Sequence, residues 1–179
     1  MKRNHISFIM NPINSWEKII MKLKKCLSFL VLGIALIALA ACGKKSTEDI
    51  IKTELRDSYV GYSANPGDEY PFNEGDDVLT FNKKENSITN SQGHMTYFSI
   101  LPEKDIPSGT QRVIDELEGQ LKGTDNFTII ISSKKNPTKD NAEAAYQISL
   151  SDGGKKIRIF ELRRNQRSFG YYDFSGKAK

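Results

Sequence analysis

Cys42 has the clearest chemical context of any residue in the sequence. It follows Leu39-Ala40-Ala41, which end an almost entirely apolar run from Cys26 to Ala41. The basic segment Met21-Lys22-Leu23-Lys24-Lys25 stands before this run. A basic start, an apolar run and small residues before a cleavage point form a secretory signal peptide. We therefore expect cleavage between Ala41 and Cys42, which would leave a cysteine thiol at the start of the mature chain.

Leu39-Ala40-Ala41-Cys42 resembles the lipobox of bacterial lipoproteins, and the resemblance covers residues 21–43. It implies that the Cys42 thiol receives a diacylglyceryl group and that the chain is cut before it. It also implies a location on the cell membrane, lipid-anchored and facing outside the cytoplasm. An uncleaved transmembrane anchor is the alternative. The apolar run has 16 residues, which is short of the roughly 18–20 that a spanning helix needs.

These features predict four segments. Residues 1–20 are interpreted as a non-native N-terminal extension, because Met21 opens a signal of ordinary length and Glu17 is unusual in a basic leader. A longer cytoplasmic leader is the alternative for these residues. Residues 21–41 form the signal peptide, 42–45 a lipidated tether, and 46–179 a single domain of common size.

Charge and cysteine content narrow the function classes. The whole chain has 26 basic and 22 acidic residues; removal of 1–41 takes away six basic residues and one acid, which leaves a net charge of −1. Nucleic-acid binding therefore loses its electrostatic support. Cys26 leaves with the signal and Cys42 carries lipid, so the domain has no thiol for a disulfide or a cysteine–zinc site. No cofactor and no metal site are expected.

The remaining pattern predicts an α+β fold, in which an antiparallel sheet of five to seven strands packs against one or two helices. Ser46 should cap a first helix that carries Ile51, Leu55 and Tyr59 on one face and ends near Gly61. Ser108 and Gln111 have capping-box spacing for a second helix that ends near Gly123. Strands are expected at 78–81, 87–89, 96–101, 127–131, 146–150, 157–162 and 169–174.

The order of these elements is loosely similar to cystatin-like small lipoproteins of Gram-positive bacteria. The similarity rests on element order, the lipobox and the hairpin from Phe81-Asn82-Lys83-Lys84 to Ile88-Thr89. It implies a curved sheet packed on a helix and a Gram-positive membrane. The similarity implies no biochemical activity for this chain.

Three patterns within the domain contain residue types that serve in catalysis or metal binding. His94 precedes a strand in a loop and lacks a visible catalytic partner. Ser132-Ser133-Lys134-Lys135 matches the Ser-x-x-Lys pattern of penicillin-binding enzymes, but their other elements are missing. The segment 67–77 carries five carboxylates without EF-hand spacing. We interpret these as a surface histidine, a coincidence and a solvated acidic loop.

Basic residues are concentrated in the last third of the chain. Residues 42–125 carry a net charge of −7 and residues 126–179 a net charge of +6. The basic part could compensate the acidic part of the same domain, or it could form a surface for anionic polymer or lipid. The candidate residues for such an anionic-ligand surface are Arg158, Arg163, Arg164 and Arg167, with Tyr171 and Tyr172 beside them.

The sequence therefore predicts a cell-surface lipoprotein that acts as a non-enzymatic binding or accessory module of the envelope. Its expected partners are the membrane, through the lipid on Cys42, and an envelope protein or an anionic polymer. The alternative is a small carboxylate-dependent envelope enzyme acting on a glycan. Two buried carboxylates facing one cleft would favour the enzyme, and an exposed apolar or aromatic patch would favour binding.

Overall fold

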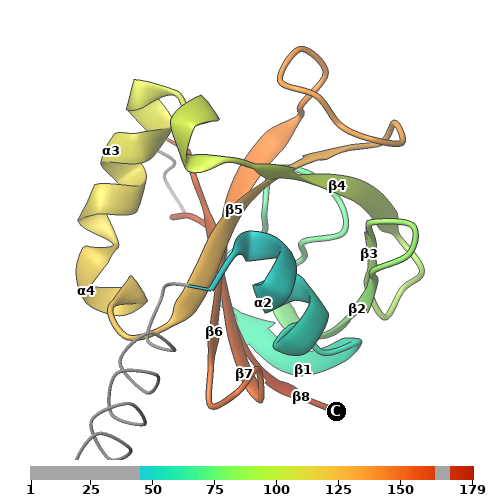
Figure 1. Ribbon diagram of the computed structural model, residues 1–179. Helices are drawn as coiled ribbons and strands as arrows, with labels where there is room; N and C mark the ends of the chain where they lie inside the picture. Colours follow the sequence, from blue (N-terminus) through green and yellow to red (C-terminus); the bar gives the residue numbers. More distant parts are fainter. Residues whose placement is uncertain (1–44, 164–169) are drawn as a thin grey trace, which may run out of the picture. The chain divides into compact units, whose positions relative to one another are not determined.

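Side chains alternate between the two faces of each strand, and this alternation places one apolar row from every strand in a common interior. The computed structural model describes residues 45–163 and 170–179. Within them, eight antiparallel strands form a closed barrel, each pairing with the next and β8 pairing with β1 (Figure 1). The strands are β1 (Ser58–Ser63), β2 (Gly75–Asn82), β3 (Ser87–Thr89), β4 (Met95–Leu101), β5 (Asp125–Ser132), β6 (Ala144–Ser151), β7 (Lys156–Glu161) and β8 (Asp173–Ala178).

The helices are short, and the first of them lies across an opening of the barrel (Figure 1). They are α2 (Thr47–Thr53), the 3-10 helix η1 (Glu103–Asp105), α3 (Ser108–Glu116) and α4 (Glu118–Leu121). Ser46 caps α2, because its hydroxyl accepts the Asp49 backbone N–H at 3.1 Å. Among the described residues, no helix has both the length and the apolar character needed to cross a bilayer.

Bulky side chains fill the barrel interior. The largest fully buried ones come from strands around the whole barrel and from the loops that close it. An eight-stranded barrel is just wide enough for side chains to fill it or for one small ligand to replace them. Here the side chains fill it, so the interior is a packed core. Its members include Tyr59, Phe72, Leu79, Ile88, Ile131, Tyr146, Ile148 and Phe174.

Two glycines permit the closure between β1 and β8. Gly61 lies opposite Gly176 in the antiparallel register. A Cβ atom on Gly61 would lie 2.6 Å from the Gly176 Cα and 2.6 Å from the Phe174 Cζ. Real Cβ atoms do not approach other atoms so closely. Glycine at this position therefore lets the two strands pair while the Phe174 ring occupies the interior beneath them.

The α+β prediction is wrong, because the sheet closes on itself and leaves no open face for a helix layer. The decisive segment is 58–63, which we expected to end the first helix. Tyr59 and Ser63 instead point into the barrel and Val60 and Tyr62 point outward, as the period of a strand requires. This strand joins β2 to β8, so the curved open sheet that the cystatin-like resemblance implied is also wrong.

Other local predictions differ from the structure in extent. The predicted hairpin turn between β2 and β3 is confirmed at 83–86. The expected second helix is divided at Leu117, and Pro107 rather than Ser108 occupies its N-cap position. Gly123 adopts the left-handed conformation expected after a helix, with φ 77°. The last strand spans 173–178 rather than 169–174, and Phe169 lies outside the described residues.

The two ends of the barrel differ. We call the end with α2, the tight turns 83–86 and 152–155 and the C-terminus the turn end. There the Tyr59 hydroxyl donates to the Gly154 carbonyl at 3.0 Å and accepts the Arg56 backbone N–H at 2.8 Å. We call the opposite end, which carries the longer connections 64–74, 90–94 and 133–143, the loop end.

Candidate binding groove on the barrel wall

A groove of about 520 Å³ runs along the outer side of the barrel wall, over β1, β8, β7 and the end of β6. We call it the outer groove. Gln120 and Thr124 flank it from the α4 side. Strand residues form the rest of its lining: Val60, Gly61, Tyr62, Asp76, Ser149, Ser151, Lys156, Ile157, Arg158, Ser175, Gly176 and Lys177.

The strand register assembles the outer groove from two rows of outward-facing residues. The first row runs Tyr62–Ser175–Arg158–Ser149 across β1, β8, β7 and β6. The second row runs Val60–Lys177–Lys156–Ser151 across the same strands, two residues nearer the turn end. Residues far apart in the sequence thus lie side by side because antiparallel partners face each other across 4.7–4.9 Å.

Tyr62 and Val60 give the outer groove an exposed apolar and aromatic wall. Their side chains are 53 % and 49 % exposed, although they belong to residue types that are usually covered. Gly61 and Gly176 lie in the floor between the rows, so part of that floor is bare backbone. The arrangement offers a ligand contact area on the Tyr62 and Val60 side chains and on the surface of the paired backbone.

Three cations and the carboxylate of Asp76 define the electrostatics of the outer groove. The Arg158 guanidinium pairs with Asp173 at 2.6 Å and lies 4.4 Å from the centre of the Phe160 ring. Lys156 pairs with Asp152 at 2.7 Å, and its hydrogen bond lowers the pKa of that carboxyl group. Lys177 has no acidic partner within the described part of the chain.

Lys177 also lies directly opposite Lys156 in the register of β7 and β8. Like charges that face each other across a strand pair destabilise it. Lys156 can turn toward Asp152, whereas Lys177 has only Val60 opposite it on its other side. An anion between the two lysines would remove this repulsion.

The arginines that the sequence singled out are not all brought together. Arg158 lines the outer groove, but Arg163 pairs with Asp68 beyond the end of β7. Arg164 and Arg167 lie outside the described residues, as do Ala41 and Cys42. Tyr172 is buried in the core, and burial, followed by the charge of Asp77, raises the pKa of its phenol.

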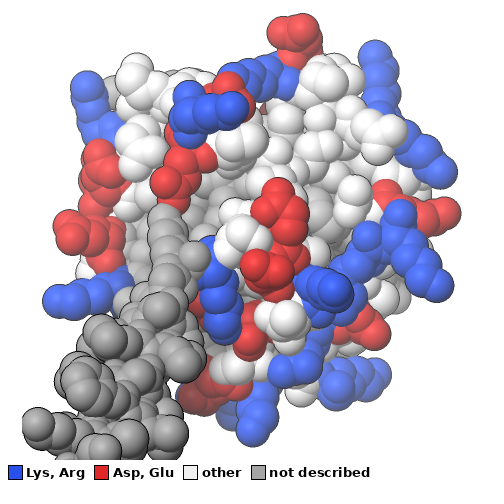
Figure 2. Space-filling model, viewed as in Figure 1, with Lys and Arg blue, Asp and Glu red and all other residues white. Residues whose placement is uncertain are grey.

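Arg163 pairs with Asp68 of the acidic part of the domain, whereas Arg158 pairs with Asp173 within the basic part. Figure 2 shows the same mixing of positive and negative side chains over the visible face. Four residues of the outer groove were not predicted from the sequence: Val60, Tyr62, Lys156 and Lys177. Val60 and Tyr62 alternate with inward-facing residues, as in a strand, and this alternation could have identified them as surface residues. It was not recognised because segment 58–63 was interpreted as the end of a helix.

A second cavity, of about 640 Å³, lies between α3 and the barrel near the end of β7. Glu161 is its buried carboxylate, only 4 % exposed, and accepts the Tyr172 backbone N–H at 3.2 Å. Val113 and Leu117 of α3 supply apolar contacts on the other side. Arg163 and Asp173 also line this cavity, but each already has an ion-pair partner.

The remaining catalytic patterns have structural roles. His94 lies in the β3–β4 loop as expected, and its ring centre is 4.2 Å from that of Tyr70. Ser132 and Ser133 donate hydrogen bonds to Glu143 at 3.2 and 2.7 Å, so a carboxylate rather than a lysine is their partner.

The acidic segment 67–77 does not gather its carboxylates. Asp68 binds Arg163, whereas Asp77 is buried and accepts the backbone N–H groups of Val78 and Ser91 at 2.7 and 2.9 Å. Over the described ranges, no group of three or more His, Cys, Asp or Glu side chains is placed to hold a metal ion.

Comparison of the chain with protein-family models, with curated proteins and with solved structures gives no match. The fold and the groove define the class that the structure supports: a small antiparallel β-barrel with a filled interior and a groove on its wall.

Proposed function

We propose that this protein is a lipid-anchored lipoprotein on the outer side of a bacterial cytoplasmic membrane, and that its barrel is a binding module for an anionic component of the envelope. The outer groove is the observation that carries the proposal. It combines exposed Val60 and Tyr62 with Lys177, a cation without an acidic partner among the described residues.

The chemistry of the outer groove suits a ligand with both an anionic and an apolar or ring-shaped part. Tyr62 offers a flat face for stacking, and a tyrosine contributes contact area at low entropic cost. An anion next to Lys177 and Lys156 would be attracted by both and would relieve their mutual repulsion. The filled barrel interior supports a site on the wall rather than inside the barrel.

A carboxylate-dependent enzyme acting on a glycan is the second candidate function. It is favoured by the cavity beneath α3, where Glu161 is buried and Glu116 and Asp173 lie on the same lining. However, Asp173 is neutralised by Arg158, and Glu161 accepts a backbone N–H group, so both carboxylates have structural partners. Loss of a measured glycan-cleaving activity in Glu161→Gln would favour this candidate instead.

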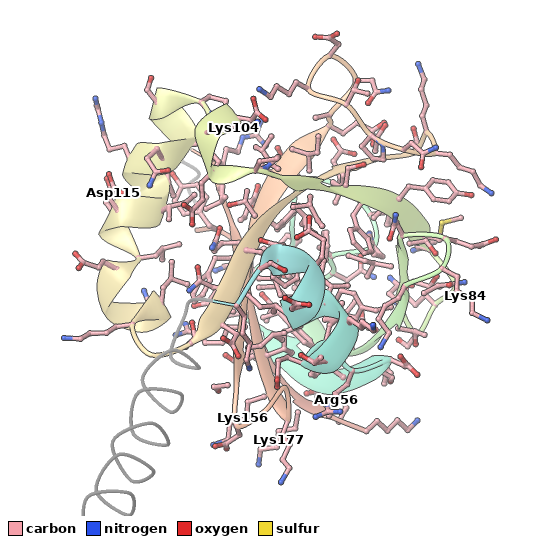
Figure 3. The ribbon with its side chains drawn as sticks, viewed as in Figure 1. Arg56, Lys84, Lys104, Asp115, Lys156 and Lys177 are labelled. Atoms are coloured by element: carbon pink, nitrogen blue, oxygen red, sulfur yellow. The ribbon has the colours of Figure 1, made fainter. Side chains whose placement is uncertain are left out.

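The binding proposal is tested by titrating the processed protein with purified anionic wall polymer and, separately, with phosphatidylglycerol vesicles. Lys177→Gln should weaken binding about fivefold at low salt, since one lysine near an anionic surface contributes about 1 kcal/mol. Lys104→Gln is the matched control, because Lys104 lies on η1 away from Lys156 and Lys177 (Figure 3).

Two results would contradict the binding proposal. The first is a protein that binds neither ligand. The second is an equal loss of affinity in Lys177→Gln and Lys104→Gln, which would show that net charge rather than the outer groove is responsible.

A further inference from the structure

Two ion pairs hold Lys45 at the turn end of the barrel. Lys45, the first described residue, places its Nζ 2.9 Å from Glu54 Oε1 and 3.0 Å from Asp125 Oδ2. Cys42 precedes it by three residues, and three residues span at most about 11 Å. A lipid on Cys42 therefore holds this part of the barrel close to the bilayer.

The outer groove opens near the same end. Asp125, which binds Lys45, lies in one register row with Leu150, Ile157 and Gly176. Gly176 is thus three strand spacings, or about 14 Å, around the barrel from Asp125. Lys177 is the next residue after Gly176 and faces outward. Lys45 and the lysines of the groove therefore lie at the same end of the barrel.

Several cations gather at the turn end, beside the carboxylates of α2. Arg56, Lys156 and Lys177 lie together at the turn end (Figure 3), and Lys and Arg side chains line the lower edge of the domain in Figure 2. Lys155 and Lys179 belong to the same end by their position in the β6–β7 turn and at the C-terminus. The loop end carries the acidic segment 67–77. An anionic surface would attract the lysines and the arginine of the turn end.

We propose that the occupant of the outer groove is the anionic phospholipid headgroup of the membrane that carries the protein's own anchor. This inference rests on the proposed function. The turn end and the groove face the bilayer, and the loop end projects away from it. Lys156 and Lys177 contact headgroup phosphates, while Tyr62 lies at the interfacial level where amphipathic rings are favoured. The lipid anchor keeps the barrel near the membrane, and the lysines orient the groove toward the headgroups.

The sequence allows a direct test, because its only tryptophan, Trp16, precedes the expected cleavage site. Tyr62→Trp places a single reporter in the groove of the mature chain. Tyr70→Trp is the matched control, since Tyr70 is 62 % exposed and lies in the 64–74 connection of the loop end. Each lipidated protein is reconstituted into phosphatidylglycerol–phosphatidylcholine vesicles that contain a headgroup spin label, and quenching of the tryptophan fluorescence is measured.

We expect quenching at position 62 to exceed that at position 70 at least threefold. The difference should disappear in 1 M salt, where the screening length is about 3 Å, and in Lys156→Gln/Lys177→Gln. Equal quenching at both positions, or quenching that the lysine substitutions leave unchanged, would overturn the proposal.

Two further outcomes separate this inference from the function on which it rests. The mass of each purified protein is measured first, and a chain without lipid on Cys42 would refute the anchoring itself. If soluble wall polymer alters the fluorescence at position 62 while labelled lipid does not quench it, the groove binds polymer. That result overturns the headgroup proposal and leaves the binding module in place.

Discussion

Replacement of Gly61 with alanine should disrupt the seam that closes the barrel. The added Cβ would lie 2.6 Å from the Gly176 Cα and from the Phe174 Cζ, and the Ser175 carbonyl oxygen is also in its way. Two of these three obstacles are backbone atoms of β8, so they cannot move aside as a flexible side chain would. The clashes can be relieved only if β1 and β8 separate. The two strands pair only from Tyr59 to Tyr62 on the β1 side, so a local separation affects most of their contact.

The expected loss of stability is about 3 kcal/mol, at the upper end of the usual cost of overpacking, because the seam must open as well. For a domain of this size, that corresponds to a fall of roughly 10 °C in Tm. Gly119→Ala is the matched control. Nothing lies within 4 Å of a Cβ at Gly119, which is in α4, so alanine should stabilise the protein by about 0.5–1 kcal/mol.

Both variants are compared with the parent protein by urea denaturation followed by circular dichroism. A loss below about 1 kcal/mol for Gly61→Ala would refute the argument, because clashes with backbone atoms of a closed seam cannot be relieved so cheaply. Hydrogen exchange adds a local readout. The amides of β1 and β8 should exchange faster in the variant, while those of β5 and β6 should change less.

Two further predictions concern hydrogen bonds at opposite ends of the barrel. Tyr59→Phe removes a buried hydroxyl that bonds both Gly154 and Arg56; it should cost about 1–3 kcal/mol in urea denaturation, and an unchanged midpoint would contradict the role of this hydroxyl. At the loop end, hydrogen bonds from the Ser133 hydroxyl, the Ser133 N–H and the Ser132 hydroxyl lower the pKa of Glu143. The stability contributed by this carboxylate is therefore present above the ordinary pKa of 4.5 and is lost as pH falls through the lowered value. Glu143→Gln should accordingly be less stable than the parent at pH 7 and no less stable at pH 3, and a difference independent of pH would contradict the assignment.

Local sequence signals identified most of the barrel's parts. The β2–β3 turn and the left-handed Gly123 were predictable because they depend on a few adjacent residues. The first helix was extended too far because Ile51, Leu55 and Tyr59 have helical spacing, although the α-helix ends at Thr53. Tyr59 fits both a helical stripe and the inward row of a strand. Pairing with β8 decides between them, and that partner lies more than a hundred residues away.

The site was harder to predict for the same reason. Arg158 and Arg163 were grouped because they are close in the sequence, yet one lies on the barrel wall and the other beyond the end of β7. The residues that do meet in the groove come from β1, β7 and β8. These residues are close in space only because the sheet closes and the strands pair in this register. Neither closure nor register can be predicted from a short segment of the sequence.

The mass of the protein purified from membranes tests the central claim most directly. If Cys42 is the lipid attachment site, the intact mass should equal residues 42–179 plus a diacylglyceryl group, and Cys42→Ser should abolish this species and release the protein from the membrane. A parent chain that retains residues 21–41, or one that begins after Ala41 without lipid, would contradict the account.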